Sequence, residues 1–303
     1  MIRTIYKCPN CSKALKQGLK QYFCPNGHSF DIARKGYVNL LLSSHIGSGN
    51  PGDTKEMLQS RREFLDKGYY EEFSDTLNTQ TDRLCFSVEK LQSSLSKENN
   101  EINIYDAGCG EGYYISRLKK SLTGSRTNEN IDNADLAFKD IPSDCSVNYY
   151  GTDVSKDAIN YAAGRDREIR FAVASNYHIP LIDNSVDCIL CIFAPRDEKE
   201  FRRILKPAGK LIVAVPGARH LYSLKKLIYR APEEIGLKGT VQQGFKLIDE
   251  TNVHYDIYLK DKPDIQNLFK MTPYSRHADD EALSNMEELV TEVDINILTY
   301  ERL

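Results

Sequence analysis

One stretch of the chain decides its fold, residues 102–114 with the sequence INIYDAGCGEGYY. An apolar run that ends in an acid, followed by three glycines and a helix-forming segment, predicts a strand, a tight turn and the start of a helix. Glycine allows the backbone of such a turn to approach a bound ligand closely. The DxGxGxG spacing suits a cofactor with a charged amino-acid tail better than one with a pyrophosphate.

We predict that this turn binds S-adenosylmethionine. In such a site the turn backbone contacts the ribose and methionyl portions of the cofactor, and the acid reaches its ammonium group directly or through water. The predicted cofactor-binding residues of this first element are Asp106, Gly108, Gly110, Glu111, Gly112 and Tyr113.

Two further strand ends belong to the predicted cofactor site. Residues 148–155 form an expected strand that ends near Asp153, whose carboxylate suits the hydroxyls of a ribose. Ser155 is placed to cap the helix that follows. Residues 170–176 end in Ser175 and Asn176, where an adenine edge would be held.

A fourth expected strand, within residues 186–195, would face the transferred methyl group with its carboxyl end. Phe193, Ala194 and Pro195 are the candidates for the wall of the target-base pocket, although Phe193 suits the core equally well. A fifth strand is expected at 210–215 and the last strands near 251–258 and 290–301. A loop over the pocket is expected to carry His220 and Arg276. The catalytic general base is not identified by the sequence.

Five alternating strands and helices at short spacing predict an α/β fold, a Rossmann-like class I methyltransferase domain with a parallel sheet. An NAD-dependent dehydrogenase is the competing interpretation. Its ribose-binding acid follows the glycine turn by about 20 residues, whereas Asp153 lies 45 residues after Gly108, partly because a polar insertion occupies residues 122–145. No histidine or lysine stands out for hydride transfer, so the pattern favours a methyltransferase.

The N-terminal segment contains a second motif, a CxxC pair that is followed twelve residues later by CxxxH. Each half of the motif points its ligands into one pocket, and the two halves together complete a tetrahedron. The motif predicts one structural zinc ion in a small zinc ribbon, held by Cys8, Cys11, Cys24 and His28. A redox CxxC beside an unrelated cysteine and histidine is the weaker alternative.

Positive charge is concentrated around this zinc motif. The whole chain has a net charge of −3, but residues 1–50 hold seven lysines and arginines against Asp31 alone, a net of +6. This segment is predicted to contact RNA, with Tyr22, Phe23 and Tyr37 stacking on unpaired bases. The alternatives are a solvated lysine surface and aromatic rings that belong to the core.

The composition and motifs divide the chain into three expected parts. These are a zinc-binding RNA-recognition module at 1–42, a linker and helix at 43–75, and the S-adenosylmethionine-dependent methyltransferase domain at 76–303. The linker helix would be capped by Thr54 and stop at Gly68. Two interpretations of residues 50–53 and of the pair Arg61-Arg62 stay open. They lie over the cofactor or the RNA, or they merely join the domains.

The apolar runs of the sequence are only as long as strands, and the N-terminus does not read as a signal peptide. These features predict a cytoplasmic protein without membrane contact.

Several of these segments together resemble one protein family, the bacterial zinc-containing 23S rRNA guanine-N1 methyltransferases, over nearly the whole chain. The resemblance rests on the zinc motif with its continuation to GYVNLL, on PGDTKEMLQSRREFLDKGYY at 51–70, on DAGCGEGYY and GTDVSKDAI, and on the segment that starts FAPRDEKEF at residue 193. Generic methyltransferases lack the zinc module and the GYVNLL and PGD segments.

The resemblance implies transfer of a methyl group to N1 of one guanine in a hairpin loop of 23S rRNA, a zinc module that helps to recognise RNA, and homodimers. Two features depart from the family pattern: the 122–145 insertion is long and polar, and the chain has no tryptophan for stacking. The main alternative is a small-molecule methyltransferase with a purely structural zinc ribbon. A non-catalytic adaptor on a decayed fold is the third hypothesis, against which the intact glycine turn counts.

Overall fold

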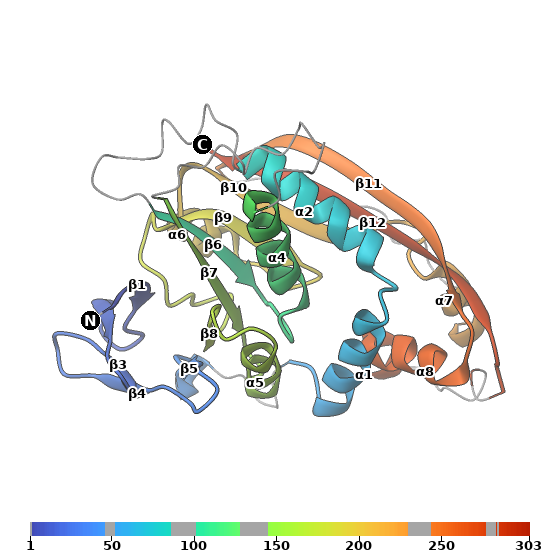
Figure 1. Ribbon diagram of the computed structural model, residues 1–303, viewed down its shortest axis with the longest axis horizontal. Helices are drawn as coiled ribbons and strands as arrows, with labels where there is room; N and C mark the ends of the chain where they lie inside the picture. The colour runs from blue at the N-terminus through green and yellow to red at the C-terminus, as the bar shows by residue number, and fades with distance from the viewer. Residues whose placement is uncertain are drawn as a thin grey trace.

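The computed structural model of the chain describes residues 2–45, 52–85, 101–127, 145–229, 244–276, 283 and 285–303. Its main feature is an eight-stranded sheet with helices on it, beside a smaller four-stranded sheet formed by the N-terminus (Figure 1). The strands of the large sheet are β5 (Val38–Asn39), β6 (Glu101–Ala107), β7 (Ser146–Asp153), β8 (Arg170–Val173), β9 (Val186–Ile192), β10 (Leu205–Pro216), β11 (Phe245–Leu259) and β12 (Leu289–Arg302).

The strand order of the large sheet is β11-β12-β10-β9-β6-β7-β8-β5. The six strands from β10 to β5 pair in parallel, and β12 pairs antiparallel with both β10 and β11. The order reverses between β6 and β9, where a ligand crevice is expected outside the strand carboxyl ends. The predicted Rossmann-like fold is therefore confirmed, including both late strands.

The linker helix begins and ends close to its predicted positions, and the helix predicted after Ser155 begins as expected. Thr54 caps α1, accepting a hydrogen bond from the Met57 backbone, and Ser155 caps α5 in the same way. None of the described helices is long and apolar enough to cross a bilayer. The helices are α1 (Lys55–Asp66), α2 (Glu71–Cys85), α4 (Tyr113–Thr127), α5 (Lys156–Arg165), α6 (Glu198–Ile204), α7 (Tyr222–Ile228) and α8 (Lys262–Met271), with the 3-10 turns η1 (Ser43–His45) and η3 (Pro273–Arg276).

Two expectations about the middle of the chain are corrected. No helix lies between β8 and β9, which are joined by turns and isolated bridges, so the expected alternation is broken once. The expected insertion at 122–145 also begins too early. Helix α4 continues to Thr127 with Leu122 fully buried, and residues 128–144 lie outside the described residues.

The N-terminal strands form a small antiparallel sheet in the order β1-β2-β3-β4 (Ile2–Lys7, Ala14–Gln17, Gln21–Phe23 and Ser29–Asp31). The next strand, β5, is only two residues long and pairs with β8 of the large sheet. The expected boundary at residue 42 therefore cuts off one strand of the large sheet. The boundary at residue 42 remains a proposal, with β5 as the connection between the ribbon and the large sheet.

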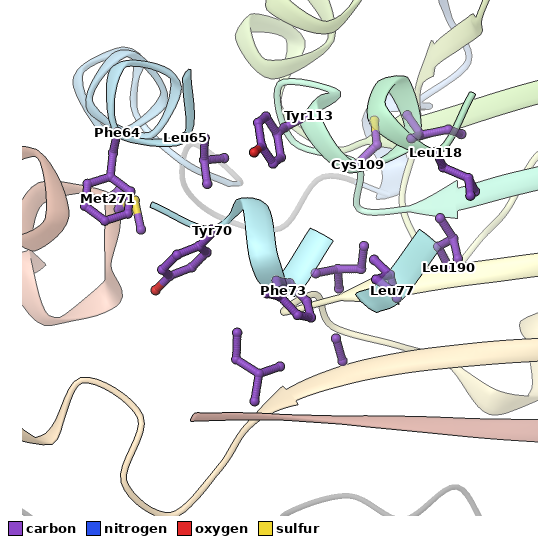
Figure 2. Packing of buried hydrophobic residues seen from close by; sticks show 14 of the residues in the cluster. Phe64, Leu65, Tyr70, Phe73, Leu77, Cys109, Tyr113, Leu118, Leu190 and Met271 are labelled. Atoms are coloured by element: carbon purple, nitrogen blue, oxygen red, sulfur yellow. The ribbon is translucent and has the colours of Figure 1, made fainter. Parts of the chain in front are cut away.

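Buried side chains on the two faces of the large sheet form two separate clusters. Along β9, Leu190 belongs to the cluster that contains Phe73 and Leu77 of α2 (Figure 2), whereas Ile189 belongs to the cluster that contains Tyr6 of the small sheet. This alternation follows from the two-residue period of a strand. The sheet therefore holds α2, α4 and α5 on one face, and the N-terminal ribbon together with α6 on the other.

Shortening a side chain of the first cluster should measure how much it stabilises the fold. Leu77 is 1% exposed, so Leu77→Ala should lower the free energy of unfolding by about 2–5 kcal/mol through lost burial and a residual cavity. Urea unfolding followed by circular dichroism measures this change. Thr79→Ala, at an exposed position of the same helix, should change it by less than about 0.5 kcal/mol. Equal effects of the two substitutions would contradict the assignment of this core.

Candidate active site and metal cluster

A cavity of about 810 Å³ lies at the carboxyl ends of the parallel strands. Its walls come from the glycine turn after β6, the ends of β7, β8, β9 and β10, one face of α1, and the segment after α8. Nearly all of the predicted cofactor-binding and target-base residues line this cavity. The one exception is Gly112. Those that line it are Asp106, Gly108, Gly110, Glu111, Tyr113, Asp153, Ser175, Asn176, Phe193, Ala194 and Pro195.

The glycine turn is shaped by close contacts that leave no room for side chains. A Cβ added to Gly108 would lie 2.5 Å from the Cβ of Ala194, and one added to Gly112 would lie 3.0 Å from the Cβ of Ala162. Both glycines, like Gly110, have positive φ angles, which other residues rarely adopt. Gly112 thus packs the turn against α5, and Gly108 packs it against the end of β9.

Two carboxyl groups flank this turn, Asp106 buried and Asp153 half-buried. Asp153 accepts hydrogen bonds from the backbone N–H of Gly110 at 3.1 Å and of Ser155 at 2.8 Å, so it holds the turn against the end of β7. Asp106 is 1% exposed, and burial, reinforced by the charge of Asp153, raises its pKa to about 8. An acid in this position is well suited to a bound cation, whose charge would stabilise the ionised form.

Glu111 and Tyr113 lie against arginines of α4 and α5. One carboxylate oxygen of Glu111 accepts hydrogen bonds from Arg165 at 2.8 and 2.6 Å, while burial raises the pKa of Glu111 to about 7. The ring of Tyr113 lies 5.6 Å from the guanidinium carbons of both Arg117 and Arg165. The arginine partner of Glu111 was missed by the sequence reasoning, because it lies 54 residues further along the chain.

The expected adenine edge forms a polar corner of the cavity. The Asn176 amide donates a hydrogen bond to the Pro195 carbonyl at 2.9 Å, which joins the loop after β8 to the end of β9. The amide oxygen of Asn176 is buried and has no hydrogen-bond partner in the described part of the chain. A buried acceptor without a hydrogen bond costs free energy, and an amino group of a ligand could donate that bond.

An aromatic wall stands at the end of β9. Phe193 is 40% exposed with a φ of +52°, and its ring stacks on His220 at 5.9 Å between centroids. His220 is buried, which lowers its pKa to about 3, and its Nδ1 accepts a hydrogen bond from the Asp294 backbone at 3.2 Å. The structure thus places a neutral His220 behind an accessible Phe193. The side chain of Arg276 is outside the described residues.

The segment before α1 also lies at the cavity, which the sequence left open. Gly52, Asp53 and Arg61 line it, whereas Arg62 does not, and Asn50 lies outside the described residues. Arg61 forms an ion pair with Asp53 and donates to the backbone carbonyl of Met271 at 3.0 Å. Part of the predicted linker is therefore a wall of the site.

The four residues of the N-terminal motif form a compact cluster. The Nδ1 atom of His28 lies 3.6 Å from the sulfur of Cys8 and 3.4 Å from that of Cys24, and the sulfurs of Cys11 and Cys24 are 3.7 Å apart. All four ligand atoms lie within 4.8 Å of one another. These separations fit a tetrahedron around zinc, whose bonds to sulfur are about 2.3 Å long.

The aromatic residues of the ribbon are not placed as expected. Tyr22 is 2% exposed and Tyr37 is 8% exposed, so neither ring can stack on an RNA base. Tyr22 packs edge-on against Tyr6 of β1, with ring centroids 5.5 Å apart, and Tyr6 packs in the same way against Tyr150 of the large sheet. Phe23 is only partly buried.

Comparison with known proteins recognises both parts of the chain. Residues 6–47 match a zinc-ribbon family described as "RlmA, N-terminal", and residues 134–213 match a methyltransferase domain. A Micromonospora griseorubida protein, provisionally named a 23S rRNA (guanine-N(1)-)-methyltransferase, is 34% identical over 72% of this chain and 68% of its own length. The 23S rRNA (guanine(748)-N(1))-methyltransferase of Streptomyces fradiae is 28% identical over 96% of this chain and 94% of its own.

The chain belongs to the 23S rRNA (guanine-N1)-methyltransferase family. This family uses S-adenosylmethionine and one zinc ion, and the residues present fit both. The buried Asp106 suits an ammonium group, the unpaired amide oxygen of Asn176 suits an amino group, and the Cys/His cluster offers four ligands without an open position.

Removing one ligand from the Cys/His cluster should release the metal. Cys11→Ser should reduce the zinc content from one ion per chain toward none and destabilise the ribbon, since a small zinc module gains much of its folding free energy from the metal. Elemental analysis of the purified protein measures the metal. Cys85→Ser, at a cysteine outside the cluster, should keep the ion. Retention of zinc by Cys11→Ser would contradict the ligand set.

The raised pKa of Asp106 predicts that cofactor binding is coupled to proton release. Asp106 is mostly protonated at pH 7, and a bound ammonium group favours its ionised form. The affinity for S-adenosylhomocysteine should therefore rise from pH 6 toward pH 8, with a proton released on binding at pH 7. Calorimetry in two buffers of different ionisation enthalpy measures this proton. Asp106→Asn should abolish the release, and an unchanged release in that variant would contradict the role of Asp106.

Proposed function

We propose that this chain transfers the methyl group of S-adenosylmethionine to N1 of a guanine in a hairpin loop of 23S rRNA. When bound, the cofactor supplies an electrophilic methyl group on a sulfonium with a good leaving group. The protein then has mainly to position the two reactants and exclude water. The glycine turn with Asp106 and Asp153 would hold the cofactor, and Phe193, Ala194 and Pro195 would form the wall against the target base.

One observation carries the RNA part of the proposal: the ribbon is bonded to the loop that lines the cavity. The backbone N–H of Lys7 donates to Pro180, and that of Ile182 donates to Ile5, both at 2.9 Å. The same loop carries Ser175, Asn176 and Tyr177 at the cavity wall. An RNA bound on the ribbon would therefore lie beside the cavity.

Exposed groups on the ribbon and at the cavity suit a looped RNA. Lys13, Lys16 and Lys20 are exposed on the ribbon, and Tyr177 is 54% exposed at the cavity. Lysines neutralise phosphates without reading sequence, and an exposed ring can stack on an unpaired base. The target base must leave its stack to reach the methyl group, and Phe193 offers an accessible ring for it.

The methyl acceptor can be tested directly. Labelled S-adenosylmethionine should transfer its methyl group to unmodified bacterial 23S rRNA, with 1-methylguanosine as the product nucleoside by mass spectrometry. Asp106→Ala should abolish the transfer because the cofactor loses its partner. The combined replacement of Lys13, Lys16 and Lys20 by Gln should raise the KM for RNA and leave cofactor affinity unchanged.

The same experiment separates the alternative, a small-molecule methyltransferase whose zinc ribbon is purely structural. That enzyme would leave the rRNA unlabelled although it binds the cofactor, and the three lysine replacements would not alter its activity. Wild-type protein that binds the cofactor without labelling rRNA would therefore overturn the proposal. We further propose that the enzyme acts in the cytoplasm as a homodimer, which light scattering on the purified protein tests.

A further inference from the structure

The charges on the cavity wall match those of S-adenosylmethionine with one exception. The wall carries four carboxyl groups, those of Asp53, Asp106, Glu111 and Asp153. The ligand carries two positive groups, its sulfonium and its ammonium, which an acidic cavity stabilises. It also carries one carboxylate, which carboxyl groups cannot stabilise. A partner for this carboxylate must come from a positive side chain on the wall.

Among the lining residues that the structure describes, Arg61 is the one lysine or arginine. The histidine of the wall, His220, is neutral because burial lowers its pKa to about 3. Arg61 shares one face of α1 with Met57, Leu58 and Leu65, since residues three or four apart lie above one another on a helix. The helix therefore presents one cation to the cavity from an otherwise apolar face.

The guanidinium of Arg61 stands beside the glycine turn. A Cβ added to Gly110 would lie 3.7 Å from one of its terminal nitrogens. That nitrogen is paired with Asp53, and the other donates to the Met271 carbonyl at 3.0 Å. A guanidinium has five N–H donors, so these two bonds orient the group and leave donors for a ligand.

We propose that Arg61 binds the carboxylate of the methionyl tail of S-adenosylmethionine, while Asp53 and the Met271 carbonyl hold its guanidinium in place. A planar guanidinium matches a carboxylate with two parallel hydrogen bonds, which a lysine at the same position would not reproduce. The proposal rests on the cofactor part of the proposed function and requires nothing of the RNA.

A purely structural role for Arg61 is the alternative that the test must separate. In that case Arg61 would only link the segment before α1 to the end of α8. The two roles differ toward decarboxylated S-adenosylmethionine, which keeps the sulfonium and the amine but lacks the carboxylate. Loss of a structural link would weaken the binding of both ligands, whereas loss of a carboxylate partner would weaken the binding of S-adenosylmethionine alone.

Calorimetric titration of both ligands into the full-length protein provides the test. Arg61→Ala should weaken binding of S-adenosylmethionine by roughly 10- to 100-fold, the usual range for a lost hydrogen bond to a charged group, and leave binding of the decarboxylated ligand unchanged. Arg61→Lys should show a smaller loss with the same selectivity. Arg62→Ala is the matched control, because Arg62 is the next residue on the same helix, lies off the cavity wall and pairs with Asp66 at 3.7 Å.

Equal weakening of both ligands in Arg61→Ala and Arg61→Lys would overturn the proposal and assign Arg61 the structural role. Unchanged affinity for S-adenosylmethionine in Arg61→Ala would overturn it as well. Wild-type protein that binds neither ligand would overturn the S-adenosylmethionine-dependent function itself. A failure to methylate rRNA has no bearing on the result, because no RNA is present in the titration.

Discussion

The close approach of the glycine turn to the end of β9 is the constraint on which the site depends. A Cβ added to Gly108 would lie only 2.5 Å from the Cβ of Ala194. The turn and the strand end therefore form one continuous wall. The turn is fixed from the other side by Asp153, which accepts the N–H of Gly110. A side chain at Gly108 would separate the predicted cofactor and base-binding surfaces, which lie on either side of this contact.

The ribbon depends on a comparable contact with the large sheet. Tyr6 is buried, and its ring packs edge-on against Tyr22 of the ribbon and Tyr150 of β7, with both pairs of centroids 5.5 Å apart. Its hydroxyl donates to the Arg170 carbonyl at 2.9 Å, so the polar end of the ring is also satisfied. The zinc cluster orders the ribbon internally, while Tyr6 fixes its position relative to the cavity. A basic surface can guide RNA to one cavity only if that position is kept.

Local signals made most of the fold and the cofactor turn predictable. Strand ends, glycine spacing and the caps at Thr54 and Ser155 are set by neighbouring residues, and the structure reproduces them. The features that were missed join distant residues. Strand β5 pairs with β8, and Arg61 reaches a carbonyl 210 residues away. The burial of Tyr22 was not predicted either, because an aromatic ring suits a core and a base equally until the packing of its neighbour Tyr6 on Tyr150 is known.

The division of charge between ribbon and cavity follows from the chemistry of the two ligands. A cavity lined by four carboxyl groups and one arginine suits a sulfonium cofactor, but it offers little attraction to the phosphates of RNA. Attraction of the RNA must therefore come from elsewhere, and residues 1–50 carry a net charge of +6 in a chain whose total is −3. This separation favours entry of an uncharged base into the cavity while its phosphates stay on the ribbon side. An unpaired base in a loop meets that requirement with less distortion than a base inside a duplex.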